Sequence, residues 1–171
     1  MYFNKKQPMK LKSISFLIML FSLSLNLNAQ TNIPELNKEI INYVESVIGT
    51  QVERGECWDL ANQALIKVEA DWDREYKYGK KIDPKKDKVF PGDLIQFENV
   101  KVKYTKGNAT YTEIMEHHTA IVYKVLGKGV YELAHQNTEF SGRKVGLSKL
   151  DINTVVHGKM YFYRPTKNLK K

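Results

Sequence analysis

The spacing of apolar positions changes near the middle of this chain. From Ile33 to Ile48 apolar residues recur every three or four positions, which predicts an amphipathic helix ended by Gly49. The same stripe begins again near Cys57 and continues to Val68, so a second helix is expected there. Both helices precede all the strands that the pattern predicts.

After Tyr78 the sequence changes to short β-branched and aromatic segments separated by turn-forming residues. Gly107 and Asn108 indicate a hairpin turn, and residues 127–129 indicate another. Helices followed by an antiparallel sheet predict an α+β fold. The predicted strands cover residues 94–97, 100–105, 109–114, 118–126, 130–136 and 160–164.

Composition separates the first 29 residues from the rest. They open with four lysines and no acidic residue: Lys5, Lys6, Lys10 and Lys12. The apolar run ISFLIMLFSLSL follows, too short for a bilayer span, and Ala29 supplies a small residue for cleavage. Residues 1–29 are therefore predicted to be a secretory signal, and residues 30–171 a single domain.

The predicted signal carries half of the net charge. Of 27 basic residues, four fall in the signal, which leaves 23 against 19 acidic residues, or +4 in place of +8. A balance this mild does not indicate a nucleic-acid partner. No further apolar run is long enough to span a membrane, so we expect an exported product, periplasmic or extracellular, without stable membrane insertion. The sequence leaves the oligomeric state open.

The chain has one cysteine, Cys57, at the predicted start of the second helix. Backbone N–H groups and the helix dipole at such a position favour a thiolate. The neighbouring carboxylates of Glu56 and Asp59 raise the pKa of a thiol, and Arg54 offsets them in part. Cys57 is thus either a nucleophile or a small buried apolar residue.

A thiol nucleophile needs a base, usually a histidine. His118 begins a predicted buried strand, and the next strand ends with His135 and Asn137 on one face. With a two-residue turn between these strands, Val122 pairs with His135 and Ala120 with Asn137, so both histidines and Asn137 share one side. A three-residue turn would place them on opposite faces.

These residues lie in an order that resembles a known family. GECWDLA, FPGDLIQF, HTAIVYKV, HQN and MYFYRP resemble the CHAP (cysteine, histidine-dependent amidohydrolase/peptidase) and NlpC-type branch of the papain-like superfamily. The resemblance extends from about Gln51 to Pro165. It implies a papain-like fold in which N-terminal helices pack on an antiparallel sheet or half-barrel.

The resemblance also implies a role for each motif. Cys57 would be the nucleophile, His118 the general base and Asn137 the residue that orients the imidazole. His135 stands where CHAP proteins usually have a glutamate, so it is a second candidate for that orienting role. Gln51 lies six residues before Cys57, the spacing of the oxyanion glutamine in papain-like proteases. FPGD is expected to be a structural turn, and residues 100–117 a hairpin that flanks the cleft.

The implied function is an exported cysteine hydrolase, without cofactor or metal, that cuts amide bonds of peptidoglycan or a peptide. The bond is either within the stem peptide or at the sugar–peptide amide. The alternative from another class is a surface binding protein that keeps the fold without catalysis. A metal site at His117, His118, His135 and Glu116 is disfavoured, because neighbours on a strand point to opposite faces.

Overall fold

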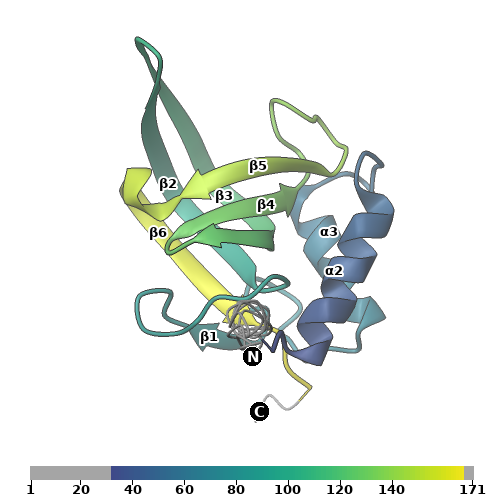
Figure 1. Cartoon of the computed structure of the whole chain (residues 1–171). Helices are drawn as coiled ribbons and strands as arrows, with labels where there is room; N and C mark the ends of the chain where they lie inside the picture. The colour runs from purple at the N-terminus through teal and green to yellow at the C-terminus, as the bar shows by residue number, and fades with distance from the viewer. Residues whose placement is uncertain (1–31, 168–171) are drawn as a thin grey trace, which may run out of the picture. The chain divides into compact units, whose positions relative to one another are not determined.

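Two amphipathic helices open the part of the chain that the computed structural model describes, residues 32–167. α2 spans Glu35–Val47 and α3 spans Cys57–Lys67, and both bury the stripes that predicted them (Figure 1). Neither helix in residues 32–167 is long and apolar enough to cross a membrane. The predicted signal, residues 1–29, lies outside the described residues.

Within the described residues, six strands follow and form one antiparallel sheet in the order β1-β6-β2-β3-β4-β5. This content confirms the α+β class. A short 3-10 helix, Ile152–Thr154, precedes the last strand. The strands are β1 (Lys80–Ile82), β2 (Leu94–Lys106), β3 (Ala109–Gly127), β4 (Val130–His135), β5 (Gly146–Asp151) and β6 (Val155–Arg164).

Four of the predicted strands are halves of two longer strands, β2 and β3. Asn99 interrupts the pattern of β2 with a positive φ of 51°, beside register shifts between β2 and β6. On β6, Gly158 has a φ of 90°, and a Cβ at this position would collide with the carbonyl of Asn99. The break in the sequence pattern is therefore a β-bulge inside a continuous strand. β1 and β5 were not predicted, because both are short and rich in lysine, glycine and serine.

The turn between β3 and β4 is the predicted one, but the predicted pairing beyond it is wrong. Gly127 pairs with Val130, as a two-residue turn requires. Two bulges on β3 then shift the partners, so Val122 pairs with Leu133 instead of His135. Because the total shift is two residues, the side chains keep the faces that the two-residue turn gave them.

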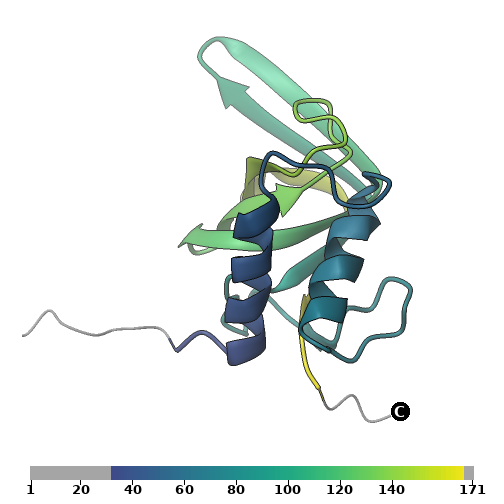
Figure 2. The same cartoon turned by 90° about the vertical axis from the view of Figure 1, so that its right-hand side faces the viewer.

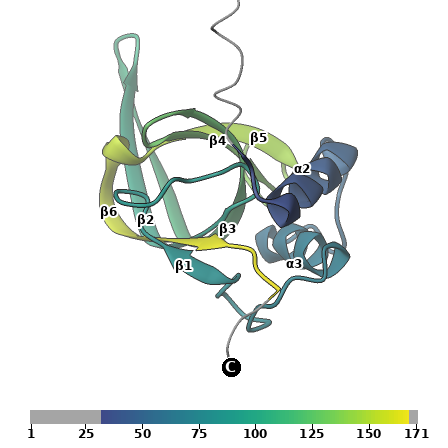
Figure 3. The same ribbon diagram turned by 60° about the horizontal axis from the view of Figure 1, so that its bottom comes forward.

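Apolar residues line both faces of the sheet. One cluster joins α2 and α3 to the sheet through Leu94, Ile121 and Ala134. A second occupies the other face, with Phe97 and Val122 among its members, and Figure 3 shows the strands curling around it. Figure 2 looks onto the two helices. The site residues on β3 and β4 thus lie between two cores.

The predicted turn before β2 anchors α2 and β6. The buried carboxylate of Asp93 accepts hydrogen bonds from the backbone N–H of Phe90 (2.8 Å) and from Asn37 on α2 (2.8 Å). It also pairs with the guanidinium of Arg164 at the end of β6, 2.9 Å away. Gly92 is required here, because a Cβ would lie 2.5 Å from the carbonyl oxygen of Asn37.

β2 and β3 extend beyond the rest of the sheet as a two-stranded arm, residues 103–112 (Figures 1 and 2). The pairing of β2 with β6 ends at Val102, whereas its pairing with β3 continues to Lys106 and Ala109. Tyr104 and Tyr111 stack on the arm with ring centroids 5.4 Å apart. The predicted hairpin turn at Gly107 and Asn108 is confirmed.

Candidate functional site

Cys57 is the first residue of α3 and is partly buried. Burial raises the pKa of its thiol, and the nearby charge of Glu56 raises it further. Hydrogen bonds from three backbone N–H groups, those of Thr119, Trp58 and Cys57 itself, act in the opposite direction. Burial outweighs them, so the thiol is protonated at neutral pH, while donors for a developing negative charge already surround the sulfur.

A buried carboxylate holds the segment that leads into α3. Asp59 is 2% exposed and accepts hydrogen bonds from the backbone N–H groups of Arg54 and Glu56, both at 3.1 Å. Its other oxygen pairs with the Arg54 guanidinium at 2.8 Å. Asp59 therefore fixes the loop rather than acting on substrate, and it satisfies donors that the start of a helix leaves free.

Gln136 braces the same loop from the sheet, a role that the sequence analysis missed. Its side chain is fully buried and donates to the carbonyl oxygens of Val52 (3.0 Å) and Glu56 (2.8 Å). Its own oxygen accepts from the backbone N–H of Val52 at 3.2 Å. A polar residue directly after the buried strand "VYELAH" was the available signal.

His118 and His135 form a buried pair on one face of the sheet. The Nε2 atom of His118 lies 2.9 Å from Nδ1 of His135, and the Nε2 atom of His135 lies 2.8 Å from Oγ of Ser148. Burial lowers the pKa of His118 to about 4 and that of His135 to about 3. Both imidazoles are thus neutral at pH 7, and Nδ1 of His118 is the ring nitrogen that neither His135 nor Ser148 contacts.

Asn137 does not occupy the position expected of an orienting residue. Its side-chain amide donates to the carboxylate of Glu56 at 2.8 Å, whereas His135 bonds to His118. The two bulges on β3 place His135 opposite Ala120, two residues from His118, and β4 ends there, so Asn137 no longer follows the sheet. A φ of 61° at Asn137 turns the chain toward the loop before α3.

Gln51 lies apart from these groups. Its side chain is exposed and donates to the carbonyl oxygen of Glu53 at 3.0 Å. It is not among the described residues that line the pocket at Cys57. Its oxyanion role therefore stays a prediction without support from this geometry, and the backbone N–H groups beside the sulfur are the donors that the structure provides.

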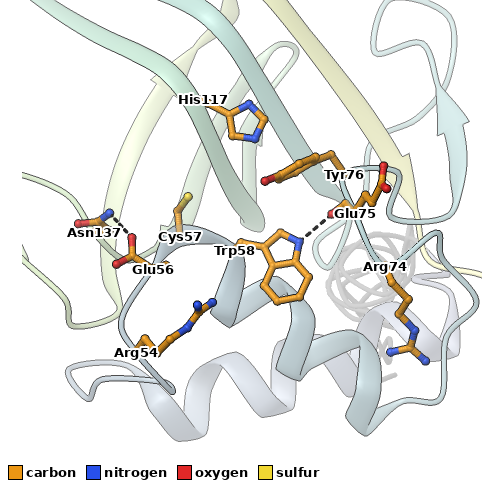
Figure 4. A pocket seen from close by; sticks show the side chains of 9 residues that line it. All are labelled: Arg54, Glu56, Cys57, Trp58, Arg74, Glu75, Tyr76, His117 and Asn137. Atoms are coloured by element: carbon orange, nitrogen blue, oxygen red, sulfur yellow. Dashed lines mark hydrogen bonds between the residues drawn. The ribbon is translucent and has the colours of Figure 1, made fainter.

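A pocket of about 490 Å³ opens at the thiol (Figure 4). Among the described residues its lining includes His117 but not His118. The indole of Trp58 forms part of the wall and donates to the carbonyl oxygen of Glu75 at 2.7 Å, which ties the loop before β1 to α3. The complete lining is Arg54, Glu56, Cys57, Trp58, Arg74, Glu75, Tyr76, His117 and Asn137.

His117 is paired with a carboxylate on the neighbouring strand. Its Nδ1 atom lies 3.0 Å from Oε2 of Glu98. Its ring packs edge to face against the ring of Tyr76, with the two ring centroids 4.3 Å apart. Hydrogen bonds from His117 and Gln96 lower the pKa of Glu98 against a desolvation effect that raises it. The sequence analysis did not predict this pair, because Glu98 and His117 are adjacent only through the pairing of β2 with β3.

The Glu98–His117 pair continues into a buried polar network. The Gln96 amide donates to Glu98 (2.9 Å), and its oxygen accepts from the hydroxyls of Thr119 (2.7 Å) and Tyr78 (3.1 Å). Burial strongly raises the pKa of Tyr78, so its hydroxyl is a neutral donor. This network fixes Thr119, whose backbone N–H reaches the thiol.

A shared metal ion has no support in the described part of the chain. Residues 32–167 contain no group of three or more histidine, cysteine, aspartate or glutamate side chains placed to hold one. His117 and His118 point to opposite faces of β3, with separate partners, Glu98 and His135.

Comparison with known families identifies a cysteine proteinase fold. The family model of the AIM3/BBC1 cysteine proteinase-fold domain matches residues 34–169. The crystal structure of Ly7917 is similar at 17% identity and a TM-score of 0.43, over 74% of this chain and 62% of that one. The crystal structure of Ly7917 with the hydrolyzing product of MDP gives 17% and 0.45, over 75% and 63%.

The chain therefore spans less than two thirds of the length of Ly7917 in these matches. No curated protein matches the chain. The family match confirms a papain-like cysteine proteinase fold, while the CHAP or NlpC-type branch stays a prediction. Since the match covers most of the residues, the chain belongs to the AIM3/BBC1 cysteine proteinase-fold domain family.

Proposed function

We propose that this protein is a cysteine hydrolase that cuts amide bonds. The observation that carries the proposal is the setting of Cys57: a partly buried thiol at a helix start, with three backbone N–H groups beside it and a pocket in front of it. A structural cysteine needs neither the donors nor the opening. We further propose that the protein is exported, on the basis of the predicted signal, and that its substrate is peptidoglycan, on the basis of the motif order.

In the proposed reaction His117 is the general base, because it lines the pocket together with Cys57, whereas His118 points to the opposite face of β3 and bonds to His135. Nδ1–H of His117 donates to the Glu98 carboxylate, so Nε2 carries the lone pair. Nε2 takes the thiol proton, and the sulfur attacks the carbonyl carbon. The same proton passes to the leaving amine, and water then releases the acyl group from the sulfur.

Electrostatics favour a protonated resting thiol. Burial raises the pKa of Cys57, so the sulfur keeps its proton before substrate arrives. Negative charge then develops on the substrate oxygen during attack, and backbone N–H groups at the start of α3 stabilise it. We expect activity to rise with pH on the alkaline side of neutrality, where the thiolate fraction grows.

Purified peptidoglycan provides the direct test. The protein lacking residues 1–29 and its Cys57→Ala variant are incubated with it, and new termini are identified by mass spectrometry. The proposal predicts new amino termini or lactyl ends with the unsubstituted protein only. Equal products from both proteins, or none from either, would refute hydrolysis of this polymer.

A binding protein on the same fold is the second candidate. The raised pKa of Cys57 favours it, because it leaves the thiol unreactive at rest. The Cys57→Ala variant separates the two, because loss of the thiol abolishes hydrolysis and leaves a binding surface in place. Saturable binding of peptidoglycan fragments by this variant with the affinity of the unsubstituted protein, together with no new termini from the unsubstituted protein, would favour binding.

A further inference from the structure

The fully buried side chain of Gln136 links the sheet to the nucleophile. The side-chain amide takes no part in the pairing of β4, because that strand ends one residue earlier, at His135. Both amide atoms instead bond to the loop before α3, and the exchange with Val52 has the reciprocal pattern of two paired strands. A buried amide with every bond directed to one loop indicates that the loop's position is what the side chain controls.

The third bond of Gln136 acts on the peptide that joins Glu56 to Cys57. That peptide is planar and trans, so its C=O and N–H point in opposite directions. The carbonyl oxygen accepts from Gln136 at 2.8 Å, and the N–H lies against the sulfur of Cys57. Fixing the oxygen on the sheet side therefore fixes the N–H on the pocket side.

Resting on the proposed function, we propose that Gln136 is the positioning residue for the oxyanion donor of this site. It aims the backbone N–H of Cys57 by holding the Glu56 carbonyl. His135, Gln136 and Asn137 are consecutive, and their side chains contact His118, the loop backbone and the Glu56 carboxylate respectively. One short segment at the end of β4 thus contacts both the buried His118 and the loop that carries the nucleophile.

The thiol itself reports on this arrangement, because the chain has a single cysteine. Gln136→Met keeps the side-chain length and removes all three hydrogen bonds. The N–H···S interaction then loosens, so we expect the pH midpoint of alkylation by iodoacetamide to rise by about one unit, a tenfold slower reaction at pH 7.5. On peptidoglycan fragments kcat falls about tenfold or more while KM stays within about twofold.

Gln63→Met is the matched control, since Gln63 lies on α3 and bonds only to the Glu53 side chain at the surface. A folded Gln136→Met protein with the alkylation profile of the control would overturn the proposal. If wild-type protein releases no product but Gln136→Met still shifts the alkylation profile, the hydrolysis proposal fails and the positioning role stands.

Gln136→Glu keeps the test usable if the methionine variant does not fold. The introduced carboxyl retains one donor while protonated and none when ionised. The ratio of its alkylation rate to that of wild type should therefore fall as pH rises through the carboxyl's ionisation. A ratio that is flat from pH 5 to pH 9 would overturn the proposal.

Discussion

His117 and His118 are adjacent in sequence and have different partners on opposite faces of β3. His118 is 9% exposed and bonds to His135, whereas His117 lines the pocket and pairs with Glu98. The thiol bonds to the backbone N–H of Thr119, the residue that follows His118. Because the two imidazoles lie on opposite faces of β3, only one of them can receive the proton of Cys57.

Single substitutions decide between them. His117→Asn should lower kcat/KM by about 10³-fold, the usual size of general-base catalysis, while His118→Asn should change it less than tenfold. Initial rates on peptidoglycan fragments, with thermal melting to confirm folding, provide the measurement. The reverse order of effects would make His118 the base and His135 its orienting residue.

The two buried imidazoles also predict how stability depends on pH. The pKa of His118 falls from 6.5 in the unfolded chain to about 4 in the folded one, and that of His135 falls to about 3. Between these values the unfolded chain binds more protons, so stability is lost as pH falls from about 6.5 toward 4, by roughly 3 kcal/mol for His118 alone.

Urea unfolding at pH 7, 6, 5 and 4 measures this loss. His135→Gln removes one of the two titrating groups, so its free energy of unfolding should change less steeply with pH than that of wild type. Equal slopes for the two proteins would show that His135 is not buried as a neutral imidazole.

The sequence was sufficient to place Cys57 at a helix start and His118 on a buried strand, because each lies in a short local motif. It was insufficient to choose between His135 and Asn137 as the partner of His118. That choice depends on the end of β4 at His135 and on the positive φ of Asn137, neither of which has a local sequence signal. Gln136 was missed because its partners lie 80 and 84 residues away in sequence.

At the scale of elements, the loop before α3 depends on the carboxylate of Asp59. Asp59→Ala leaves two backbone N–H groups without a partner and should lower the free energy of unfolding by about 2–3 kcal/mol. Arg54→Met removes a side chain that is 72% exposed, so the free energy of unfolding should fall much less than in Asp59→Ala. Urea unfolding of both variants at pH 7 tests the difference, and similar losses would mean that the ion pair matters more than the backbone contacts.

The helices and the two hairpins could be predicted, because their signals are local: apolar periodicity and glycine turns. β5 could not, because "GLSKLD" has little apolar alternation, and its strand conformation depends on pairing with β4. The bulge at Asn99 divided β2 in the prediction, since a turn-forming residue inside a strand looks like the strand's end.

At the scale of the whole molecule, Asp93 connects three distant segments through Asn37 and Arg164. Arg164→Met leaves a buried carboxylate without its cation and should cost about 3–5 kcal/mol. Lys38→Met removes an exposed ion pair with Glu35 and should change stability by less than about 0.5 kcal/mol. Adding Asp93→Asn to Arg164→Met should restore part of the loss in urea unfolding, and a further loss would contradict this account.

The class of fold followed from the order of helices and strands, but the position of β6 between β1 and β2 did not. This order brings Arg164, at the end of β6, beside the turn before β2, where it contacts Asp93 across 71 residues of sequence. Strand pairings between residues so far apart in sequence depend on the packing of both hydrophobic cores. A short window of sequence does not contain the residues of both cores.

The arm, residues 103–112, is attached to the site only at its base, where Glu98 pairs with His117. Residues inserted near Gly107 would lengthen the arm without moving that pair. Each strand would have to gain two residues, so that its side chains still alternate between the same two faces. We expect members of this family to differ more in length here than elsewhere. Differences in arm length would then change the outer surface of the molecule and leave the Glu98–His117 pair in place.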